Sequence, residues 1–256
     1  MYTILSDLDG TLLNDNNKID NDDLSLLHKI TKNNHLCIIT NSNYLNLLKI
    51  ISDYNLNVDF FSNTSNIARI NNEYIKYEIK KEIINNILNK YEDYIYTAYT
   101  ELDKCYVFNY VDRLKSFYPS DVKIINKIES DIPYLFIAIS NDIKDSFIKN
   151  INELKIEYKI EGNDSKRTIL ILYKKKLKKK DIFKLLNDKY SDKKIIGISN
   201  SYYDIDYINL CDIKIAMNNS DNKLKEIADI ITKYDNNSGG AIKELNELIN
   251  DISHLK

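Results

Sequence analysis

Short apolar runs and segments with helical spacing alternate along the first quarter of the chain. Apolar runs at 2–5, 36–39 and 58–62 predict buried strands. Between them, residues 21–32 and 44–54 repeat apolar side chains every three or four positions, which predicts two amphipathic helices. Strands and helices that alternate in this order are typical of a parallel sheet with helices packed on it.

The same alternation returns in the last third of the chain. Residues 181–190 have helical spacing, and 194–199 form another apolar run.

Residues 67–70 and 74–75 surround a pair of asparagines and predict a hairpin. The chain has only five glycines and two prolines. Asparagine tolerates left-handed backbone better than most residues, so we expect it to form many of the turns.

A different pattern separates these two regions. Apolar residues at helical spacing predict a helix from about Tyr77 to Tyr91, and the stretch 112–131 is harder to interpret because it combines a turn signal with alternating apolar residues. The rest of the region is rich in predicted strands, which indicates a separate α+β unit at about 78–172. The other elements predicted in it are strands at 106–108, 133–139, 156–160 and 168–173 and a helix at 142–154.

Composition narrows the classes of partner. The 36 basic and 38 acidic residues give a net charge of −2, which provides no general attraction to nucleic acid or to an anionic membrane. The apolar runs are far shorter than the ~20 residues of a membrane helix, and the first strand leaves no room for a signal peptide. Three cysteines without metal-ligand spacing fit a reduced compartment. We expect a soluble, cytoplasmic monomer or homodimer.

Two carboxylates follow the first predicted strand. Asp7 and Asp9 are one residue apart, and Gly10 allows the chain to turn sharply after them. Carboxylates at the carboxyl end of a strand in an open α/β sheet face the usual ligand crevice. One can act as a nucleophile and the other as a general acid and base, with a metal ion offsetting their repulsion. A polar turn and a helix cap are plainer interpretations of these residues. A helix-loop-helix calcium site is excluded, because its loop needs glycine at the sixth position and Gly10 is the fourth residue counted from Asp7.

Two other places on the chain also have a plain and a chemical interpretation. Thr40 ends the second predicted strand just before a helix, where a hydroxyl group can bind a phosphate or cap the helix. Residues 174–180 are all lysine except for one leucine, a composition typical of a solvated surface. A lysine at the start of the following helix would also counter the charge of a nucleophile and a phosphate.

Ordered motifs lie at both ends of the chain. They are Asp7-Leu8-Asp9-Gly10-Thr11-Leu12, Ile213-Lys214-Ile215-Ala216-Met217-Asn218, Ile230-Ile231-Thr232 and Gly239-Gly240-Ala241-Ile242. These motifs resemble one family, the haloacid dehalogenase-like phosphohydrolases, and over about 1–76 and 174–256 the chain is similar to its Cof-type branch (subfamily IIB). The resemblance implies a doubly wound, Rossmann-like parallel-sheet core at 1–77 and 173–256, with an inserted α+β cap domain at 78–172 that determines substrate specificity.

The resemblance also implies a reaction. The family hydrolyses phosphomonoesters: the first aspartate forms an aspartyl-phosphate, and the second is the general acid and base. Mg²⁺ is the implied cofactor, and the implied partner is a small phosphorylated metabolite, with sugar phosphates as the first choice and phosphoglycolate or a glycosyl-phosphoglycerate as the second. The roles carried over are Asp7 and Asp9 as catalytic residues, Thr40, Asn41 and Lys179 as phosphate-binding residues, and Asp7, Asp9, Asn200 and Asp204 as metal ligands.

The sequence departs from the family pattern at several places, and those that concern the proposed site residues are the following. The Gly-Arg that often follows the threonine is absent after Thr40, and the register of the lysine leaves Lys178 and Lys180 as alternatives to Lys179. Asn200 stands where the family has an aspartate that commonly binds the metal directly, with Asp206 as another possible ligand. The loss of this charge leaves a ligand-binding protein with little turnover as an alternative, and a phosphotransferase is a third function class.

Overall fold

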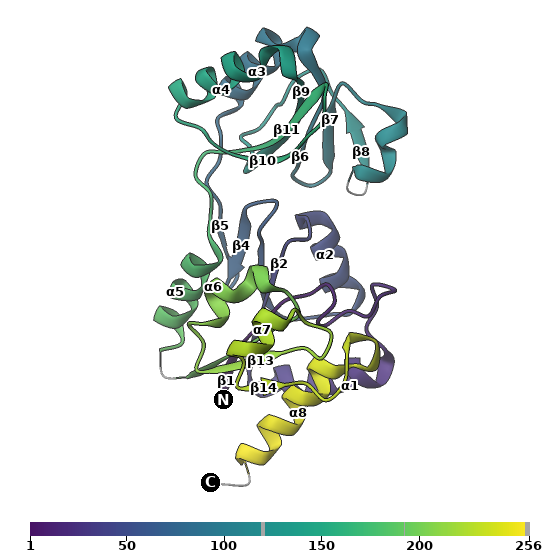
Figure 1. Cartoon of the computed structure of the whole chain (residues 1–256), viewed down its shortest axis with the longest axis vertical. Helices are drawn as coiled ribbons and strands as arrows, with labels where there is room; N and C mark the ends of the chain where they lie inside the picture. Colours follow the sequence, from purple (N-terminus) through teal and green to yellow (C-terminus); the bar gives the residue numbers. More distant parts are fainter. Residues whose placement is uncertain (119–120, 192, 254–256) are drawn as a thin grey trace.

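The structure is a computed structural model that describes residues 1–118, 121–191 and 193–253. Its strands form two sheets, and in Figure 1 the second sheet lies above the first. All six strands of the second sheet come from the middle of the chain, between Ile95 and Tyr173. The segments before and after this region together form the first sheet. Among the described residues, no helix is both long and apolar enough to cross a membrane.

The first sheet has eight strands in the order β14-β13-β12-β1-β2-β3-β4-β5. The strands from β14 to β3 are parallel, and β4 and β5 are added as an antiparallel hairpin. The order reverses beside β1, so the chain winds outward in both directions from this strand. The bounds are β1 Tyr2–Ser6, β2 His35–Thr40, β3 Asp59–Ser62, β4 Ile67–Ile70, β5 Glu73–Ile75, β12 Lys194–Ser199, β13 Ile213–Ala216 and β14 Ile230–Ile231.

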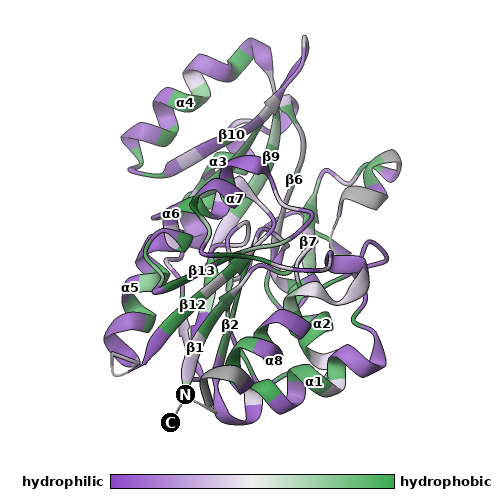
Figure 2. Ribbon diagram, turned by 60° about the horizontal axis from the view of Figure 1, so that its bottom comes forward, coloured by the Kyte–Doolittle hydropathy of each residue, from purple (hydrophilic) through white to green (hydrophobic). Residues whose placement is uncertain are grey.

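Helices cover both faces of this sheet, as Figure 2 shows. Successive residues of the central strands point to opposite faces, so Ile4 and Leu5 of β1 belong to two different apolar clusters. One cluster includes side chains of α1, α2 and α8, and the other includes side chains of α5, α6 and α7. The doubly wound α/β fold predicted from the sequence is therefore present. The helices are α1 Asn21–Asn33, α2 Tyr44–Asp53, α5 Lys179–Lys189, α6 Ile205–Ile208, α7 Asn222–Ile227 and α8 Gly240–Ser253.

The second sheet has the order β10-β11-β9-β6-β7-β8 and is antiparallel except for the β7–β8 pair. Helices α3 and α4 pack on the face away from the first sheet, where a separate apolar cluster lies (Figure 1). The other face carries tyrosines 99, 134 and 173. The bounds are α3 Lys81–Lys90, β6 Ile95–Glu101, β7 Cys105–Phe108, β8 Val122–Ile124, β9 Tyr134–Ser140, α4 Lys144–Glu153, β10 Glu157–Asn163 and β11 Arg167–Tyr173.

The structure corrects the sequence prediction in the middle of the chain. The helix expected from about Tyr77 begins at Lys81, because Ile79 pairs its backbone with Ile132 in an isolated bridge. Strand β6 was not predicted at all. Its buried positions include threonines and a glutamate as well as apolar residues, so its apolar pattern is weak. The stretch 112–131 contains a short 3₁₀ segment and β8.

Asparagine forms the turns, as the sequence predicted. Of the seven described non-glycine residues with positive φ, all except Lys155 are asparagines. Asn71 and Asn72, between β4 and β5, have φ values of 52° and 64°. Two successive left-handed residues form the turn type that matches the twist of a two-residue hairpin.

A buried carboxylate joins the two sheets. Glu101, at the end of β6, is fully buried, and its Oε2 accepts hydrogen bonds from the Ser65 hydroxyl at 2.6 Å and the Tyr44 N–H at 3.1 Å. Tyr134 of β9 donates to the same oxygen at 3.0 Å. Ser65 and Tyr44 belong to the first sheet and its helix α2, so Glu101 fixes the second sheet against the start of that helix. Burial raises the pKa of Glu101, while these donors lower it by a smaller amount.

The raised pKa of Glu101 predicts a pH-dependent effect of Glu101→Gln. A carboxyl group whose folded-state pKa is raised contributes most stability at low pH, and this contribution is lost as the pH rises through the folded pKa. The glutamine side chain keeps an acceptor and cannot ionise. We expect the variant to gain about 1 kcal/mol relative to the natural protein at pH 8 and less at pH 5. Denaturant unfolding at both pH values measures this, with Glu73→Gln on exposed β5 as the control. A variant that is equally destabilised at both pH values would contradict the prediction.

Candidate active site

The candidate site lies where three neighbouring parallel strands end. Strand β1 pairs with β2 on one side and with β12 on the other, so their carboxyl ends meet at one edge of the sheet. Asp7 follows β1, Thr40 ends β2, and Asn200 follows β12. The Asp7 N–H extends the pairing with a bond of 3.1 Å to the Ile198 carbonyl. Sheet topology thus gathers residues that lie up to 193 positions apart in the sequence.

Asp7, Asp204 and Lys179 form a buried charge cluster. Asp7 is 7% exposed and Asp204 1% exposed. The Lys179 ammonium makes an ion pair with Asp204 Oδ1, and the Ser199 hydroxyl donates to Oδ2 of the same carboxylate. Burial raises the pKa of Asp7 to about 8, with a further contribution from the charge of Asp204, and Lys179 opposes both. The cluster therefore disfavours the charged form of Asp7 unless more positive charge is added.

Asp9 lies in a different environment from Asp7. It is exposed, and its Oδ2 accepts hydrogen bonds from the hydroxyl groups of Ser42 at 2.6 Å and Thr40 at 3.3 Å. The Thr40 hydroxyl also accepts the Ser42 N–H at 3.0 Å. The two hydroxyls hold the Asp9 carboxylate at the mouth of the site. Sequence analysis did not identify Ser42 as a site residue. The feature that could have indicated it is a hydroxyl side chain two residues after the end of a predicted strand.

Asn200 lies against the turn that follows Asp9. Gly10 has a φ of 72°, and a Cβ atom at this position would overlap the Asn200 side-chain amide. The Thr11 hydroxyl donates to Asn200 Oδ1 at 3.3 Å, and Asn219 donates to the Gly10 carbonyl at 2.9 Å. The Asp-x-Asp-Gly-Thr turn and the loop after β12 are therefore packed directly on each other, which requires glycine at position 10.

The oxygens at this edge suit a small divalent cation. Asp7 and Asp204 are buried carboxylates that repel each other, and Asn200 supplies a neutral amide oxygen at the turn that follows Asp9. Mg²⁺ prefers such oxygen ligands, and its charge would offset the repulsion. Among the described residues, no three His, Cys, Asp or Glu side chains come together as a metal-binding group. A cation here would thus be held by two side-chain carboxylates together with neutral oxygens.

The three candidate lysines are placed differently. Lys179 is the one that reaches Asp204, and its side chain is only 9% exposed. Lys178 precedes the first turn of α5 and Lys180 lies within it, and both are exposed. Asp206, the alternative metal ligand, is also exposed, on the four-residue helix α6. The interpretation of residues 174–180 as a solvated surface thus fits the four exposed lysines and fails for Lys179 and Lys176, which line a cleft.

A cleft of about 710 Å³ opens beside these residues, between the two sheets. Asn41 and Lys179 line it from the first sheet, and Lys159 and Glu161 of β10 line it from the second. Asn41 is held by Asn63, whose side-chain amide donates to Asn41 Oδ1 at 2.8 Å. The remaining lining residues are Asn63, Thr64, Tyr173, Lys176, Tyr203 and Asp206. Sequence analysis assigned none of them to a substrate cleft and considered Asp206 only as a metal ligand.

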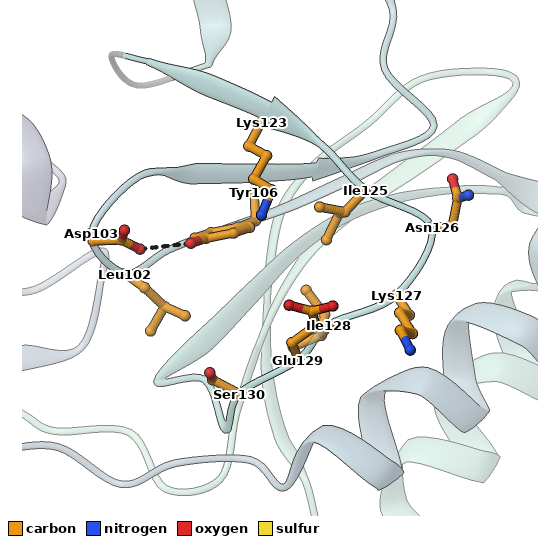
Figure 3. A pocket seen from close by; sticks show the side chains of 10 residues that line it. All are labelled: Leu102, Asp103, Tyr106, Lys123, Ile125, Asn126, Lys127, Ile128, Glu129 and Ser130. Carbon is orange, nitrogen blue, oxygen red and sulfur yellow. Dashed lines mark hydrogen bonds between the residues drawn. The ribbon is translucent and has the colours of Figure 1, made fainter.

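Another pocket, of about 320 Å³, lies on the second sheet and is shown in Figure 3. It is lined by Leu102, Asp103, Tyr106, Lys123 and residues 125–130, and the Tyr106 hydroxyl donates to Asp103 across its edge at 2.7 Å. None of the site residues predicted from the sequence lines it. The cleft between the sheets is therefore the stronger candidate for a substrate site.

The family model of the haloacid dehalogenase-like hydrolases matches residues 4–245, nearly the whole chain. The chain belongs to this family. The match spans both sheets and confirms the family that the motifs predicted, including its Cof-type branch. No curated protein matches this hydrolase at a significant level.

Solved structures share the fold. A Thermotoga maritima protein is 20% identical with a TM-score of 0.76, and the match covers 96% of this chain and 97% of that one. A haloacid dehalogenase-like hydrolase from Bacteroides thetaiotaomicron is 15% identical, with a TM-score of 0.72 and coverage of 96% and 99%. A second protein of that organism, from a study of phosphatases of the haloalkanoate superfamily, is 18% identical, with a TM-score of 0.65 and coverage of 96% and 94%. At these identities the likeness is one of fold.

The buried ion pair predicts strong coupling between Lys179 and Asp204. Lys179→Met leaves Asp7 and Asp204 as adjacent buried carboxylates without a cation, so we expect it to lower the free energy of unfolding by about 3–5 kcal/mol in metal-free buffer. Adding Asp204→Asn to this variant removes the stranded charge and should restore most of the loss. Denaturant unfolding of the double-mutant cycle in the presence of a chelator measures the coupling energy. Lys180→Met, which removes an exposed lysine, is the control; additive effects in the cycle would contradict the expectation.

Proposed function

We propose that this hydrolase is a magnesium-dependent phosphatase that cleaves a small phosphorylated metabolite, with sugar phosphates as the first choice, through an aspartyl-phosphate on Asp7. The observation that carries the proposal is the burial of Asp7 beside Asp204 and Lys179 at the strand ends, with Asp9 at the mouth of the same site. This arrangement pairs a desolvated nucleophile with a solvent-accessible acid and base. A structural relative studied among phosphatases lends further support.

Asp7 and Asp9 have different roles in this mechanism. An Asp7 carboxylate oxygen attacks phosphorus in line, the bond from phosphorus to the alcohol oxygen breaks, and Asp9 donates a proton to that oxygen. Asp9 then accepts a proton from the water that attacks the aspartyl-phosphate and releases inorganic phosphate. The hydroxyls of Ser42 and Thr40 orient the Asp9 carboxyl for both transfers.

The phosphoryl group and the cation are held by different residues. Lys179, Thr40 and the Asn41 backbone N–H bind the phosphoryl oxygens, and Lys179 also balances Asp204. Asp7, the Asp9 backbone carbonyl, Asp204 and Asn200 would hold Mg²⁺. When bound, Mg²⁺ would neutralise the charge that develops on the phosphoryl oxygens. Its charge would also favour the ionised form of Asp7, which burial disfavours.

Residues 78–172 act as the cap domain in this proposal, and residues 1–77 and 173–256 as the catalytic core. The cap contributes Lys159 and Glu161 to the cleft that the core lines with Asn41 and Lys179. A volume of about 710 Å³ suits a small metabolite. The cap thus selects the substrate and excludes water from the reacting phosphoryl group.

Asp7→Asn is the direct test of the nucleophile. An amide does not attack phosphorus, so we expect phosphate release from p-nitrophenyl phosphate and from a panel of sugar phosphates to fall by about 10⁴-fold or more. The fold should persist, because the amide replaces a carboxyl of the same shape. Circular dichroism checks this, and Asp22→Asn on exposed α1 is the control. Parallel assays with an added alcohol acceptor detect phosphotransfer. Substantial turnover by Asp7→Asn would overturn the mechanism.

A second candidate function is ligand binding with little turnover. It is favoured by Asn200, whose amide is neutral and whose Oδ1 already accepts the Thr11 hydroxyl. Such a site has one direct negative charge fewer than the family pattern and should bind Mg²⁺ weakly. The proposals differ in whether phosphate release occurs at saturating Mg²⁺.

Asn200→Asp tests how much this amide weakens the metal site. We expect the Mg²⁺ concentration for half-maximal activity, and the calorimetric Kd, to fall by about tenfold, because an anionic oxygen replaces a neutral one. Asp206→Asn is the matched control and should leave both values unchanged. If Asp206→Asn weakens Mg²⁺ binding while Asn200→Asp does not strengthen it, the metal is held by Asp206 instead.

A further inference from the structure

Lys176 lies in a segment that both sheets hold in place. Asn66, fully buried in the turn between β3 and β4 of the first sheet, donates from its side chain to the Lys175 carbonyl at 3.0 Å and accepts the Leu177 N–H at 2.7 Å. The Lys176 N–H donates to Glu157 Oε2 of β10 at 3.0 Å. The backbone on each side of Lys176 is therefore fixed, and its side chain enters the cleft from a defined position.

The Lys176 ammonium has no carboxylate partner among the described residues. Its Nζ donates to the Asn63 backbone carbonyl and lies 4.4 Å from the centroid of the Tyr173 ring. In the part of the chain that the structure describes, no carboxylate oxygen lies within 4.0 Å of it. The other two lysines that line the cleft are paired, Lys179 with Asp204 and Lys159 with Glu161. Lys176 thus differs from both in having no ion-pair partner there.

This arrangement is unfavourable in the unliganded protein. A desolvated ammonium is costly unless a negative charge lies beside it, and a carbonyl and an aromatic ring compensate only in part. Burial lowers the pKa of Lys176 to about 7, with further lowering by Lys159 and Lys179, and Glu161 opposes this by a smaller amount. An anion bound beside Nζ would reverse this balance and keep the ammonium charged.

The position of Lys176 suggests what that anion is. Asn63 accepts from Lys176 through its carbonyl and donates to Asn41 through its side chain, and Asn41 and Lys179 are phosphate-binding residues in the proposed function. Lys176 lines the same cleft, next to this phosphate position. The phosphoryl group at Lys179 already has its own cation, so Lys176 can bind another part of the same molecule.

We propose that Lys176 binds a second anionic group of the substrate, a carboxylate or a second phosphoryl group, while the scissile phosphoryl group lies at Lys179. The inference rests on the proposed function and narrows its substrate class to phosphomonoesters with another negative charge. Lys176 is then a specificity-determining residue that contacts substrate away from the reacting atoms. If Lys176 had only a structural role, it would hold its segment against Asn63, and its replacement would change kcat/KM equally for all substrates.

Matched substrate pairs separate these roles. 3-Phosphoglycerate and glycerol 3-phosphate differ by a carboxylate in place of a hydroxymethyl group, and fructose 1,6-bisphosphate and fructose 6-phosphate differ by one phosphoryl group. We expect the natural protein to have a higher kcat/KM for the more anionic member of at least one pair, which also identifies the anion. Lys176→Met should reduce this preference by about 10- to 100-fold, mainly through KM, because a charge-assisted hydrogen bond is lost. Lys176→Arg should retain much of the preference.

Lys174→Met is the matched control, because it removes an exposed lysine from the same segment and changes the net charge equally. It should leave the preference unchanged. Lys176→Met should be at least as stable as the natural protein in thermal unfolding, since it removes an unpaired, partly buried charge. Equal losses of kcat/KM on both members of each pair, or no preference in the natural protein, would overturn the inference.

A binding measurement keeps this test independent of turnover. Calorimetric titration of Asp7→Asn with each member of a pair reports affinity without hydrolysis. We expect tighter binding of the more anionic member and loss of the difference in Asp7→Asn/Lys176→Met. If the natural protein releases no phosphate from any substrate, the proposed function fails, while the same titration still decides whether Lys176 binds the second anion. Equal affinities within both pairs would then reject it.

Discussion

The mutual repulsion of two buried carboxylates, Asp7 and Asp204, is the constraint around which the site is built. Both are largely removed from water, and one ammonium, that of Lys179, balances them incompletely. Two buried carboxyl groups that share one ammonium favour any ligand that adds positive charge, because such a ligand would allow both to ionise. The fold supplies this imbalance simply by ending β1 and β12 at the same edge and starting α5 beside them.

Asn200 changes this balance by one charge relative to the family pattern. It occupies the space beside Gly10 that only a glycine leaves open, and Thr11 holds its amide oxygen. The contact shows that the loop is well packed with asparagine in it. Asn200 thus has a packing role in this loop that does not depend on the metal-binding role that we propose for it.

The substrate space is made by both sheets. Glu101 fixes the second sheet against helix α2, and Asn66 fixes the returning segment from the first sheet. Between these two anchors lies the cleft, in which three lysines converge. Two of them have carboxylate partners and Lys176 has none among the described residues, so the uncompensated charge in the cleft comes from the segment that connects the second sheet to α5. The specificity that we propose for Lys176 would therefore come from the same short stretch of chain that connects the two sheets.

The sequence by itself determined the family, the strand–helix order of the first sheet and the residues at the strand ends, because buried strands and turn residues leave local patterns and Asp7, Thr40 and Asp204 lie in ordered motifs. It missed β6, whose buried polar side chains weaken the apolar pattern, and misplaced the start of α3, which a long-range bridge at Ile79 sets. Only the tertiary structure decided which lysine reaches Asp204, and only it revealed Lys176 as unpaired. Pairing and desolvation depend on what approaches a side chain in space, and adjacent lysines of one run have the same local sequence while facing different surroundings.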